Sequence, residues 1–470
     1  MTPTTRRRDA AVCALLSVAV FAAYRGAFQV YFLNEDFSWL WRCRMGANTI
    51  WTLLTRDVML GLYSWRPLLQ LWFGLNEAIW GVHPFGFRLA ILVSHAAGAC
   101  VLYAIGTQVG DWRRGALAAL IFAVHPLHVE SLNWTCAAGG PISTAFLLVA
   151  LLGYLRWRRG VGSVWVVWAS FALALATQET AVVFLALVVA ADVLIPGPAP
   201  RIAARVRLYA GVIAVVAGFA LLHRVATAAT MNMYMVGFNP RWSLSPVALV
   251  GFVLRKLQVA AAMLLTLDAQ PSAVILPIAA ALALGALVCW WRGRPLGLWG
   301  LACIVIATAP FALLPLGPYP RHLYLALVGF AVLFAELLAS VAEVLGRWNR
   351  RIAVVCVAGL MVLWLGYMMR RIDAEMAGFI ERGRLAEALL TDLYRLVPAP
   401  RAGSTLAFYH LGDLRARQNV FVYGFDDAVR VLYDDASLQT QLGALGTAPD
   451  ATYHFMYDGG RLALIGSRQP

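Results

Sequence analysis

Charged residues are scarce in this sequence. Only 13% of its 470 residues are Asp, Glu, Lys or Arg, whereas 61% are hydrophobic. A water-soluble globular chain usually carries about a quarter charged residues, so this chain has too few polar groups to cover a water-facing surface. The scarcity excludes an ordinary soluble domain and predicts that most of the chain lies in a membrane.

Lysine is also nearly absent, and the cysteines have no recognisable spacing pattern. Lys256 is the only lysine, although the net charge is +14. The arginines form short clusters between apolar runs instead of one basic face, which argues against nucleic-acid binding and is typical of membrane topology signals. The seven cysteines show no metal-binding spacing, and no pattern supports a disulfide between Cys43 and Cys136. The lysine-poor composition is typical of GC-rich bacterial coding and favours a bacterial inner membrane.

Apolar runs recur along the chain, and basic clusters separate them at every second gap. Each run is near the roughly 17–25 residues that a membrane-spanning helix needs. Arg6, Arg7 and Arg8 precede the first run, which predicts a cytoplasmic N-terminus. We therefore expect an α-helical polytopic membrane protein with about eleven transmembrane helices. The predicted spans are 10–32, 87–108, 115–133, 141–155, 162–177, 180–195, 208–225, 272–291, 296–314, 322–345 and 352–369.

Two segments interrupt this regularity. A tryptophan-rich segment at 33–86 is too charged to span and predicts a large first outer loop with short helices at the membrane surface. Residues 244–267 are apolar enough to span, but Arg255 and Lys256 lie in their middle. An amphipathic or re-entrant helix preserves the alternation of basic loops, and whether it spans stays open.

The composition changes after Arg371, which predicts two domains, a transmembrane domain at 1–371 and a small α+β domain at 372–470. Apolar residues at helical spacing predict an amphipathic helix at 372–396. Alternating runs predict strands at 405–410, 420–423, 452–457 and 462–465, with a hairpin turn at 458–460. An odd number of spans places this domain in the periplasm.

Most remaining ionisable residues belong to one predicted side of the membrane, opposite the basic loops. Ionisable groups at membrane depth are costly and usually face a bundle interior or a wet cavity, and a single site would require such a shared side. The residues are Glu35, Asp36, Arg66, His83, His125, His128, Glu130, Glu179, Arg241, Arg321 and His322.

Residues 125–130 (His-Pro-Leu-His-Val-Glu) end the third predicted span, and Pro126 is expected to break the helix. The segment offers two imidazoles and a carboxylate, so a metal site is conceivable. The alternative is that the histidines satisfy backbone groups freed by the proline.

Glu179 and Arg321 each have two interpretations. Glu179 could cap the helix that follows it, or contact substrate. Arg321 offers a planar cation suited to phosphate, and it lies on the side that basic residues usually avoid. Interfacial snorkelling is the alternative for Arg321.

An ordered set of short motifs resembles the GT-C superfamily of membrane glycosyltransferases, closest to the protein O-mannosyltransferase-like group that includes transmembrane and tetratricopeptide-repeat proteins. The set covers about residues 30 to 345, and the repeat domain of that group is absent here. Its members are Asn-Glu-Asp-Phe at 34–37, Trp-Arg-Pro-Leu at 65–68, 80–87 with His95, 125–131 with Asn133 and Trp134, Gln-Glu-Thr at 178–180, and Arg-His-Leu-Tyr-Leu at 321–325.

The resemblance implies inverting sugar transfer from a polyprenyl-phosphate-linked donor to an acceptor hydroxyl on the periplasmic face. It implies a catalytic carboxylate at Asp36, with Glu35 second, and donor-phosphate contacts from Arg321, His322 and Tyr324. Substrate contacts are expected from five further residues of the motifs and the shared side. These are Arg66, His125, His128, Glu130 and Glu179.

The implied partners are the lipid-linked sugar, membrane lipid, and a glycan, lipid or protein acceptor. A divalent cation, Mg or Mn, is the cofactor left open.

Two other functions stay open: a transporter or flippase for a lipid-linked saccharide, and an inactive binding subunit. The first would show internal repeats, and none is evident. The second is kept open by residues 137–141, where related sequences often carry an arginine and an acid.

Overall fold

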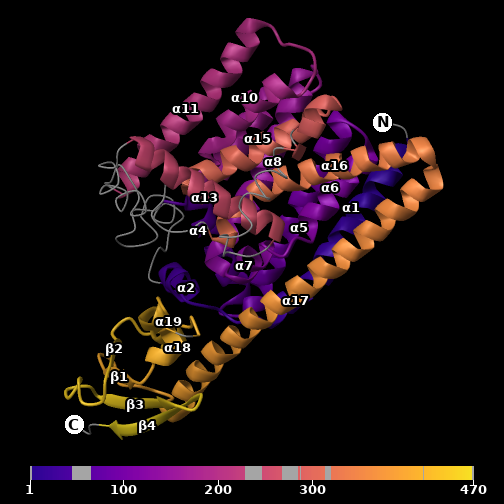
Figure 1. The fold of residues 1–470 in the computed structure, drawn as a ribbon. Coiled ribbons are helices and arrows are strands. Elements are labelled where there is room, and N and C mark those ends of the chain that lie inside the picture. The colour runs from indigo at the N-terminus through magenta and orange to yellow at the C-terminus, as the bar shows by residue number, and fades with distance from the viewer. Residues whose placement is uncertain are drawn as a thin grey trace.

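The computed structural model describes residues 3–44, 65–227, 246–266, 284–285, 287–312, 319–416 and 418–467. The chain forms a helical bundle from which one long helix leads to a small sheet domain (Figure 1). The first half of the bundle contains α1 (Pro3–Ala23), η1 (Arg25–Gln29), α2 (Asp36–Arg44), α4 (Pro67–Trp80), α5 (Pro84–Val109), α6 (Trp112–Ala123), α7 (His128–Asn133), η2 (Thr135–Ala138) and α8 (Gly139–Arg158). The second half contains α9 (Val164–Thr177), η3 (Glu179–Val183), α10 (Phe184–Leu194), α11 (Ile202–Thr227), α13 (Pro246–Thr266), α15 (Pro295–Ala312), η5 (Pro320–Leu323), α16 (Ala326–Trp348) and α17 (Arg350–Leu396).

Within the described ranges, six helical segments are long and apolar enough to cross a membrane. They are Pro84–Val109, Thr135–Arg158, Ile202–Thr227, Pro295–Ala312, Ala326–Trp348 and Arg350–Leu396. Each coincides with a predicted span, and the shorter apolar helix α9 coincides with another. The protein is therefore a multi-pass α-helical membrane protein, as expected.

Other predicted spans differ in detail. The span predicted at 115–133 is wrong as one helix, because α6 ends at Ala123 and α7 begins at His128. Pro126 lies in this break, where a ring without an N–H cannot continue the helical ladder. The segment 180–195 divides into η3 and α10, and 10–32 into α1 and η1. Most of the span predicted at 272–291 lies outside the described residues, and α13 occupies the segment at 244–267.

Close helix contacts depend on glycine. Gly300 of α15 faces Gly329 of α16, where a Cβ on Gly300 would lie 2.6 Å from the Gly329 carbonyl oxygen. Small residues allow helices to approach closely in a membrane, where burial of apolar surface gives little drive for association. The pair brings together the helices that flank η5, which carries Arg321.

The C-terminal domain is a four-stranded sheet of order β2-β1-β3-β4 with two short helices. Its elements are β1 (Thr405–Tyr409), α18 (Gly412–Ala416), α19 (Phe425–Tyr433), β2 (Gln439–Gly443), β3 (Tyr453–Asp458) and β4 (Arg461–Ser467). Strand β1 pairs in parallel with β2 and β3, and β3 pairs antiparallel with β4 through the expected hairpin. The strand predicted at 420–423 is wrong: that segment is a loop, and β2 was not predicted.

Helix α17 is a single helix of 47 residues. It contains both the predicted span at 352–369 and the predicted amphipathic helix at 372–396, so the expected domain boundary after Arg371 falls inside a helix. Figure 1 shows α17 running along the bundle and ending beside the sheet, with α2 between the bundle and α19. The sheet domain is therefore attached to the end of the bundle that carries the acidic loop, residues 34–36.

Candidate functional site

Asp36 anchors the acidic loop to the bundle. Its side chain is fully buried and accepts hydrogen bonds from the backbone N–H groups of Leu33 (3.0 Å), Thr135 (3.3 Å) and Cys136 (2.7 Å). Burial raises the pKa of Asp36, while the positive charge of Arg88 and the backbone donors act to lower it. Both carboxylate oxygens therefore hold the loop to η2.

Arg88 supports the same junction and was not predicted from the sequence. It is buried near the start of α5 and donates to Thr135 Oγ1 (2.8 Å) and to the Tyr31 carbonyl oxygen (3.1 Å). A buried guanidinium needs such partners because an uncompensated charge is costly in an apolar interior. The signal in the sequence was a lone arginine inside an otherwise apolar run.

Glu35 differs from its neighbour because part of its hydrogen-bonding capacity is unused. Its Oε2 atom is buried and has no hydrogen-bond partner among the described residues. Burial raises the pKa of Glu35 and the charge of Asp36 adds to the rise, whereas Arg321 acts to lower it. Glu35 and Arg321 therefore lie within electrostatic reach of each other, although about 290 residues separate them in sequence.

Arg321 is held by Glu130. Its Nη1 donates to Glu130 Oε1, and its backbone N–H donates to Glu130 Oε2 at 2.9 Å. The guanidinium carbon lies 4.9 Å from the Trp134 ring centroid and 4.4 Å from that of Tyr319. The side chain of Arg321 keeps 26% exposure. One carboxylate and two rings thus fix the guanidinium while part of it stays accessible.

His322 is a neutral group at physiological pH. Its ring stacks on Phe311 with 4.3 Å between centroids, and Nδ1 accepts the Tyr319 N–H at 3.3 Å. Burial, and then the charges of Arg321, Arg66 and Lys256, lower its pKa to about 3. With Nδ1 as acceptor, the single ring proton lies on Nε2, which makes His322 a hydrogen-bond donor and not a cation.

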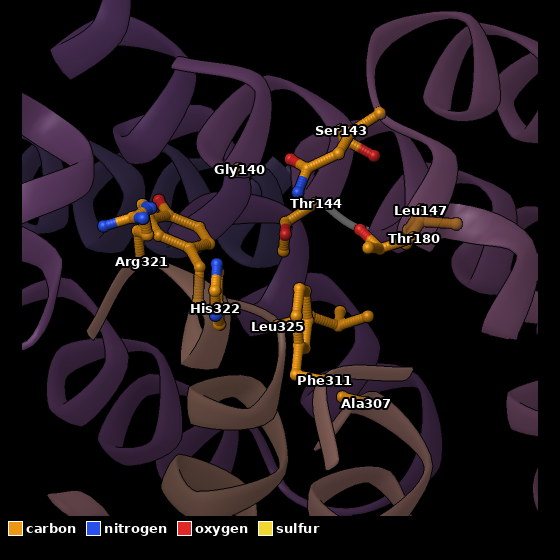
Figure 2. Close-up of a pocket in the computed structure, with 12 residues that line it drawn as sticks. Gly140, Ser143, Thr144, Leu147, Thr180, Ala307, Phe311, Arg321, His322 and Leu325 are labelled. Atoms are coloured by element: carbon orange, nitrogen blue, oxygen red, sulfur yellow. The ribbon is translucent and has the colours of Figure 1, made fainter. Parts of the chain in front are cut away.

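Arg321 and His322 line a pocket that is partly open to solvent. Figure 2 shows these two residues across the pocket from Ser143, Thr144 and Thr180, with Phe311 and Ala307 on the apolar side. The lining residues are Gly140, Ser143, Thr144, Leu147, Gln178, Thr180, Ala307, Phe311, Arg321, His322, Tyr324 and Leu325. The pocket combines a cation, a neutral N–H donor, hydroxyl groups and aromatic rings.

The expected residues Tyr324, His125 and His128 form a buried layer. Tyr324 lines the pocket with its ring, but its hydroxyl group bonds His95 Nδ1. His128 lies 4.3 Å from the Tyr324 ring and 4.6 Å from His95, between ring centroids. His125 and His128 are fully buried and do not line the pocket. In this structure they support Tyr324 from behind.

Arg66 and Glu179 pair with each other at 2.9 Å, between Nε and Oε2. Both side chains are about four-fifths buried, with 23% and 19% exposure. Glu179 begins η3, directly after the pocket residue Gln178. The ion pair joins the first loop to the pocket wall. His83 lies at the N-cap position of α5 without a side-chain capping bond, and Arg241 lies outside the described residues.

The candidate metal ligands of the described residues lie apart from one another. Across the described ranges, no three side chains of His, Cys, Asp or Glu converge as metal ligands. In the segment 125–130, both histidines are buried among apolar and aromatic neighbours, whereas Glu130 bonds Arg321. The three candidate ligands therefore do not point to one place. A divalent cation therefore stays a prediction from the sequence.

Comparison with known sequences found relatives among protein O-mannosyl-transferases, and no family model matches. The chain is 30% identical over 211 residues to Protein O-mannosyl-transferase Tmtc1 of Drosophila melanogaster, covering 42% of this chain and 24% of that protein. It is 34% identical over 112 residues to TMTC2 of Homo sapiens, covering 23% of this chain and 13% of that protein. The chain thus spans a quarter or less of the length of these relatives.

Solved structures with the same fold are membrane glycosyltransferases. The archaeal oligosaccharyltransferase AglB from Archaeoglobus fulgidus, in complex with an inhibitory peptide and a dolichol-phosphate, matches 92% of this chain and 64% of its own with TM-score 0.54 and 12% identity. ArnT from Cupriavidus metallidurans, bound to undecaprenyl phosphate, matches 98% of both chains with TM-score 0.50 and 14% identity. The fold is therefore the GT-C fold, and the resemblance inferred from the motifs is confirmed.

Proposed function

We propose that this protein is a membrane glycosyltransferase that moves a sugar from a polyprenyl-phosphate-linked donor to an acceptor hydroxyl, with inversion at the anomeric carbon. The observation that carries the proposal is the pocket, which places an accessible guanidinium beside a neutral N–H donor, while the charge of that guanidinium also reaches Glu35, a carboxylate with an oxygen that accepts no hydrogen bond from the described residues. The fold and the lipid phosphates bound by AglB and ArnT support it.

In the proposed reaction the acceptor oxygen attacks the anomeric carbon from the face opposite the phosphate. A new C–O bond forms as the bond from that carbon to the phosphate oxygen breaks, and the polyprenyl phosphate leaves with the bonding electrons. The hydroxyl proton passes to a carboxylate that acts as general base. No oxidant or reductant is needed.

We assign the base to Glu35 and an anchoring role to Asp36. The sequence resemblance favoured Asp36, but its two oxygens are occupied by three backbone N–H donors and it is fully buried. Glu35 has a carboxylate oxygen without a partner, and its raised pKa makes it a stronger base than an exposed glutamate. An unpaired carboxylate oxygen can accept the proton without breaking existing bonds.

Arg321 is proposed to hold the donor phosphate and offset its growing negative charge, with the Nε2–H of His322 as a second donor. Preorganised donors of this kind are commonly a large catalytic term, each worth about 3–4 kcal/mol. Glu130 positions the guanidinium. Figure 2 shows hydroxyl groups on the opposite wall of the pocket, which suit a neutral sugar.

The proposed setting is the bacterial inner membrane, with the acidic loop on the periplasmic side, because the basic loops lie at the other end of the bundle. The proposed acceptor is a hydroxyl group of a glycan, a lipid or a protein. Mannose is the first donor sugar to test, since the relatives are named protein O-mannosyl-transferases.

The test uses full-length protein in vesicles with polyprenyl-phosphate mannose and a panel of hydroxyl acceptors. Glu35→Gln should lower turnover by about 100-fold or more, because the base is lost while shape is kept. Glu77→Gln is the matched control, since Glu77 lies in the same outer segment but pairs with Arg44 at 3.0 Å. Unchanged turnover in Glu35→Gln contradicts the proposal.

The same vesicles separate the alternatives. A transporter would move the labelled donor across the bilayer without forming product. An inactive binding subunit would bind donor without turnover or transfer across the membrane. Either result in the wild-type protein overturns the enzyme proposal.

A further inference from the structure

The residue before Glu35 is bonded to the C-terminal domain. Val422 donates its backbone N–H to Asn34 Oδ1 at 3.0 Å, and Asn34 Nδ2 donates to the Asn419 carbonyl oxygen at 3.4 Å. Asn34 has φ +48°, a left-handed conformation that asparagine tolerates better than most residues. A segment almost 390 residues away in sequence therefore fixes the turn that presents Glu35.

The loop at 419–424, here called the clasp loop, is itself rigidly held. Arg415 donates to the carbonyl oxygens of Phe421 and Val422, each at 2.8 Å. Phe421 is buried, and its ring lies 5.7 Å from the Phe37 ring of α2, between centroids. The clasp loop thus contacts residues on both sides of the acidic pair.

Gly424 makes the closest approach in this contact. It has φ +73°, and a Cβ at this position would lie 2.6 Å from the Asn34 carbonyl oxygen and 3.0 Å from Ser38 Oγ. Any side chain larger than hydrogen would push the clasp loop away from Asn34. The glycine therefore marks a contact built for close fit.

Docking of the domain does not depend on this contact. Tyr433 donates its hydroxyl hydrogen to the Val397 carbonyl oxygen (2.7 Å), Leu462 N–H donates to Asp392 Oδ2 (3.3 Å), and Arg44 donates to the Val431 carbonyl oxygen (3.1 Å). These bonds and the continuous helix α17 keep the sheet domain at the bundle. Loss of the clasp contact should leave the domain folded and attached.

We propose that the clasp loop completes the active site, and that Asn34 is a positioning residue that holds Glu35 in its productive orientation. This inference rests on the proposed function, because it gives the C-terminal domain a role in the same reaction. The acceptor must meet a base whose backbone is fixed on one side by η2, through Asp36, and on the other by the clasp loop. Misplacement of a catalytic group by about 1 Å can cost roughly 100-fold in rate.

The first experiment compares Gly424→Ala with Gly403→Ala in full-length protein in vesicles. Gly403 has φ +74° and belongs to the same domain, but a Cβ there would meet nothing within 4 Å. Both variants carry similar backbone strain, and only Gly424→Ala adds a steric clash with Asn34. A thermal midpoint for each variant checks that the domain stays folded. Gly424→Ala should lower kcat by about tenfold or more with donor KM within about twofold of wild type. Equal kcat values in the two variants overturn the inference.

The second experiment removes the side-chain bonds at position 34. Asn34→Ala should lower kcat about as much as Gly424→Ala, with donor KM within about twofold of wild type, because it loses the Oδ1 acceptor for Val422 N–H and the Nδ2 donor to the Asn419 carbonyl oxygen. A wild-type kcat in Asn34→Ala contradicts positioning through these bonds. The proposed function fails if Glu35→Gln stays active. If Glu35→Gln is inactive while the clasp variants match their controls, this inference alone fails.

Discussion

Asp192 and Glu35, two carboxylates at opposite ends of the bundle, differ in the hydrogen bonds that they accept. At the basic end, Asp192 of α10 accepts hydrogen bonds from the hydroxyl groups of Tyr154 and Tyr209, and Arg158 and Arg205 lie 3.8 Å and 3.5 Å away. At the other end, Glu35 has an oxygen without any partner among the described residues. The hydrogen bonds of Asp192 connect α8, α10 and α11, whereas Oε2 of Glu35 connects no described elements.

The difference shows which buried charges serve the fold. A carboxylate whose two oxygens both accept hydrogen bonds stabilises the elements that supply the donors, and it has less capacity left for a substrate. Asp36 belongs to this class although it lies beside Glu35. Position in the motif does not distinguish Asp36 from Glu35, whereas the number of hydrogen bonds that each carboxylate accepts does.

The largest effect should come from Arg321→Ala. Loss of the accessible guanidinium should weaken binding of polyprenyl-phosphate sugar by about 100-fold, close to 3 kcal/mol. Arg25→Ala is the control, because Arg25 is an exposed cation whose partner is Asp373. Equilibrium binding in detergent checks this, and a change under about twofold in Arg321→Ala would remove the contrast between the two ends.

Asp192→Asn should act on stability alone. It leaves buried tyrosine and arginine donors imperfectly paired, which costs about 1–3 kcal/mol in the free energy of unfolding. Donor affinity should stay at the wild-type value. Unfolding in detergent measures the change, with the exposed Asp111→Asn as control at the same end. A large loss of donor affinity in folded Asp192→Asn would contradict a purely structural role.

The pH dependence should report Glu35. A base works when ionised, so turnover should fall as pH decreases through the pKa of Glu35. Burial raises that pKa above its ordinary value of 4.5, so the fall should begin at higher pH than for an exposed glutamate. His322, with a pKa of about 3, should add no step above about pH 4. A profile of kcat/KM against pH for wild type and His322→Gln checks both, and a limb that moves in His322→Gln contradicts the assignment.

The local pattern was sufficient for many elements. Long apolar runs predicted the spans because a lipid environment demands about 20 apolar residues whatever the neighbours are. The turn at 458–460 was predicted from its Asp-Gly-Gly sequence, because glycine readily takes the positive φ that hairpin turns need, and both glycines have positive φ in the structure. Strand β2, with sequence Gln-Thr-Gln-Leu-Gly, was missed because only pairing with β1 makes it a strand.

The sequence by itself determined a multi-pass membrane protein with an acidic first loop, a histidine-proline segment and an Arg-His pair, because hydrophobicity and residue chemistry are local properties. Only the tertiary structure decided that both oxygens of Asp36 accept hydrogen bonds while Oε2 of Glu35 accepts none from the residues that the structure describes, that Glu130 holds Arg321, and that Asn34 meets the clasp loop. Each of these depends on a donor or acceptor about 100 residues or more away. No pattern in neighbouring residues specifies which distant N–H group will occupy an oxygen.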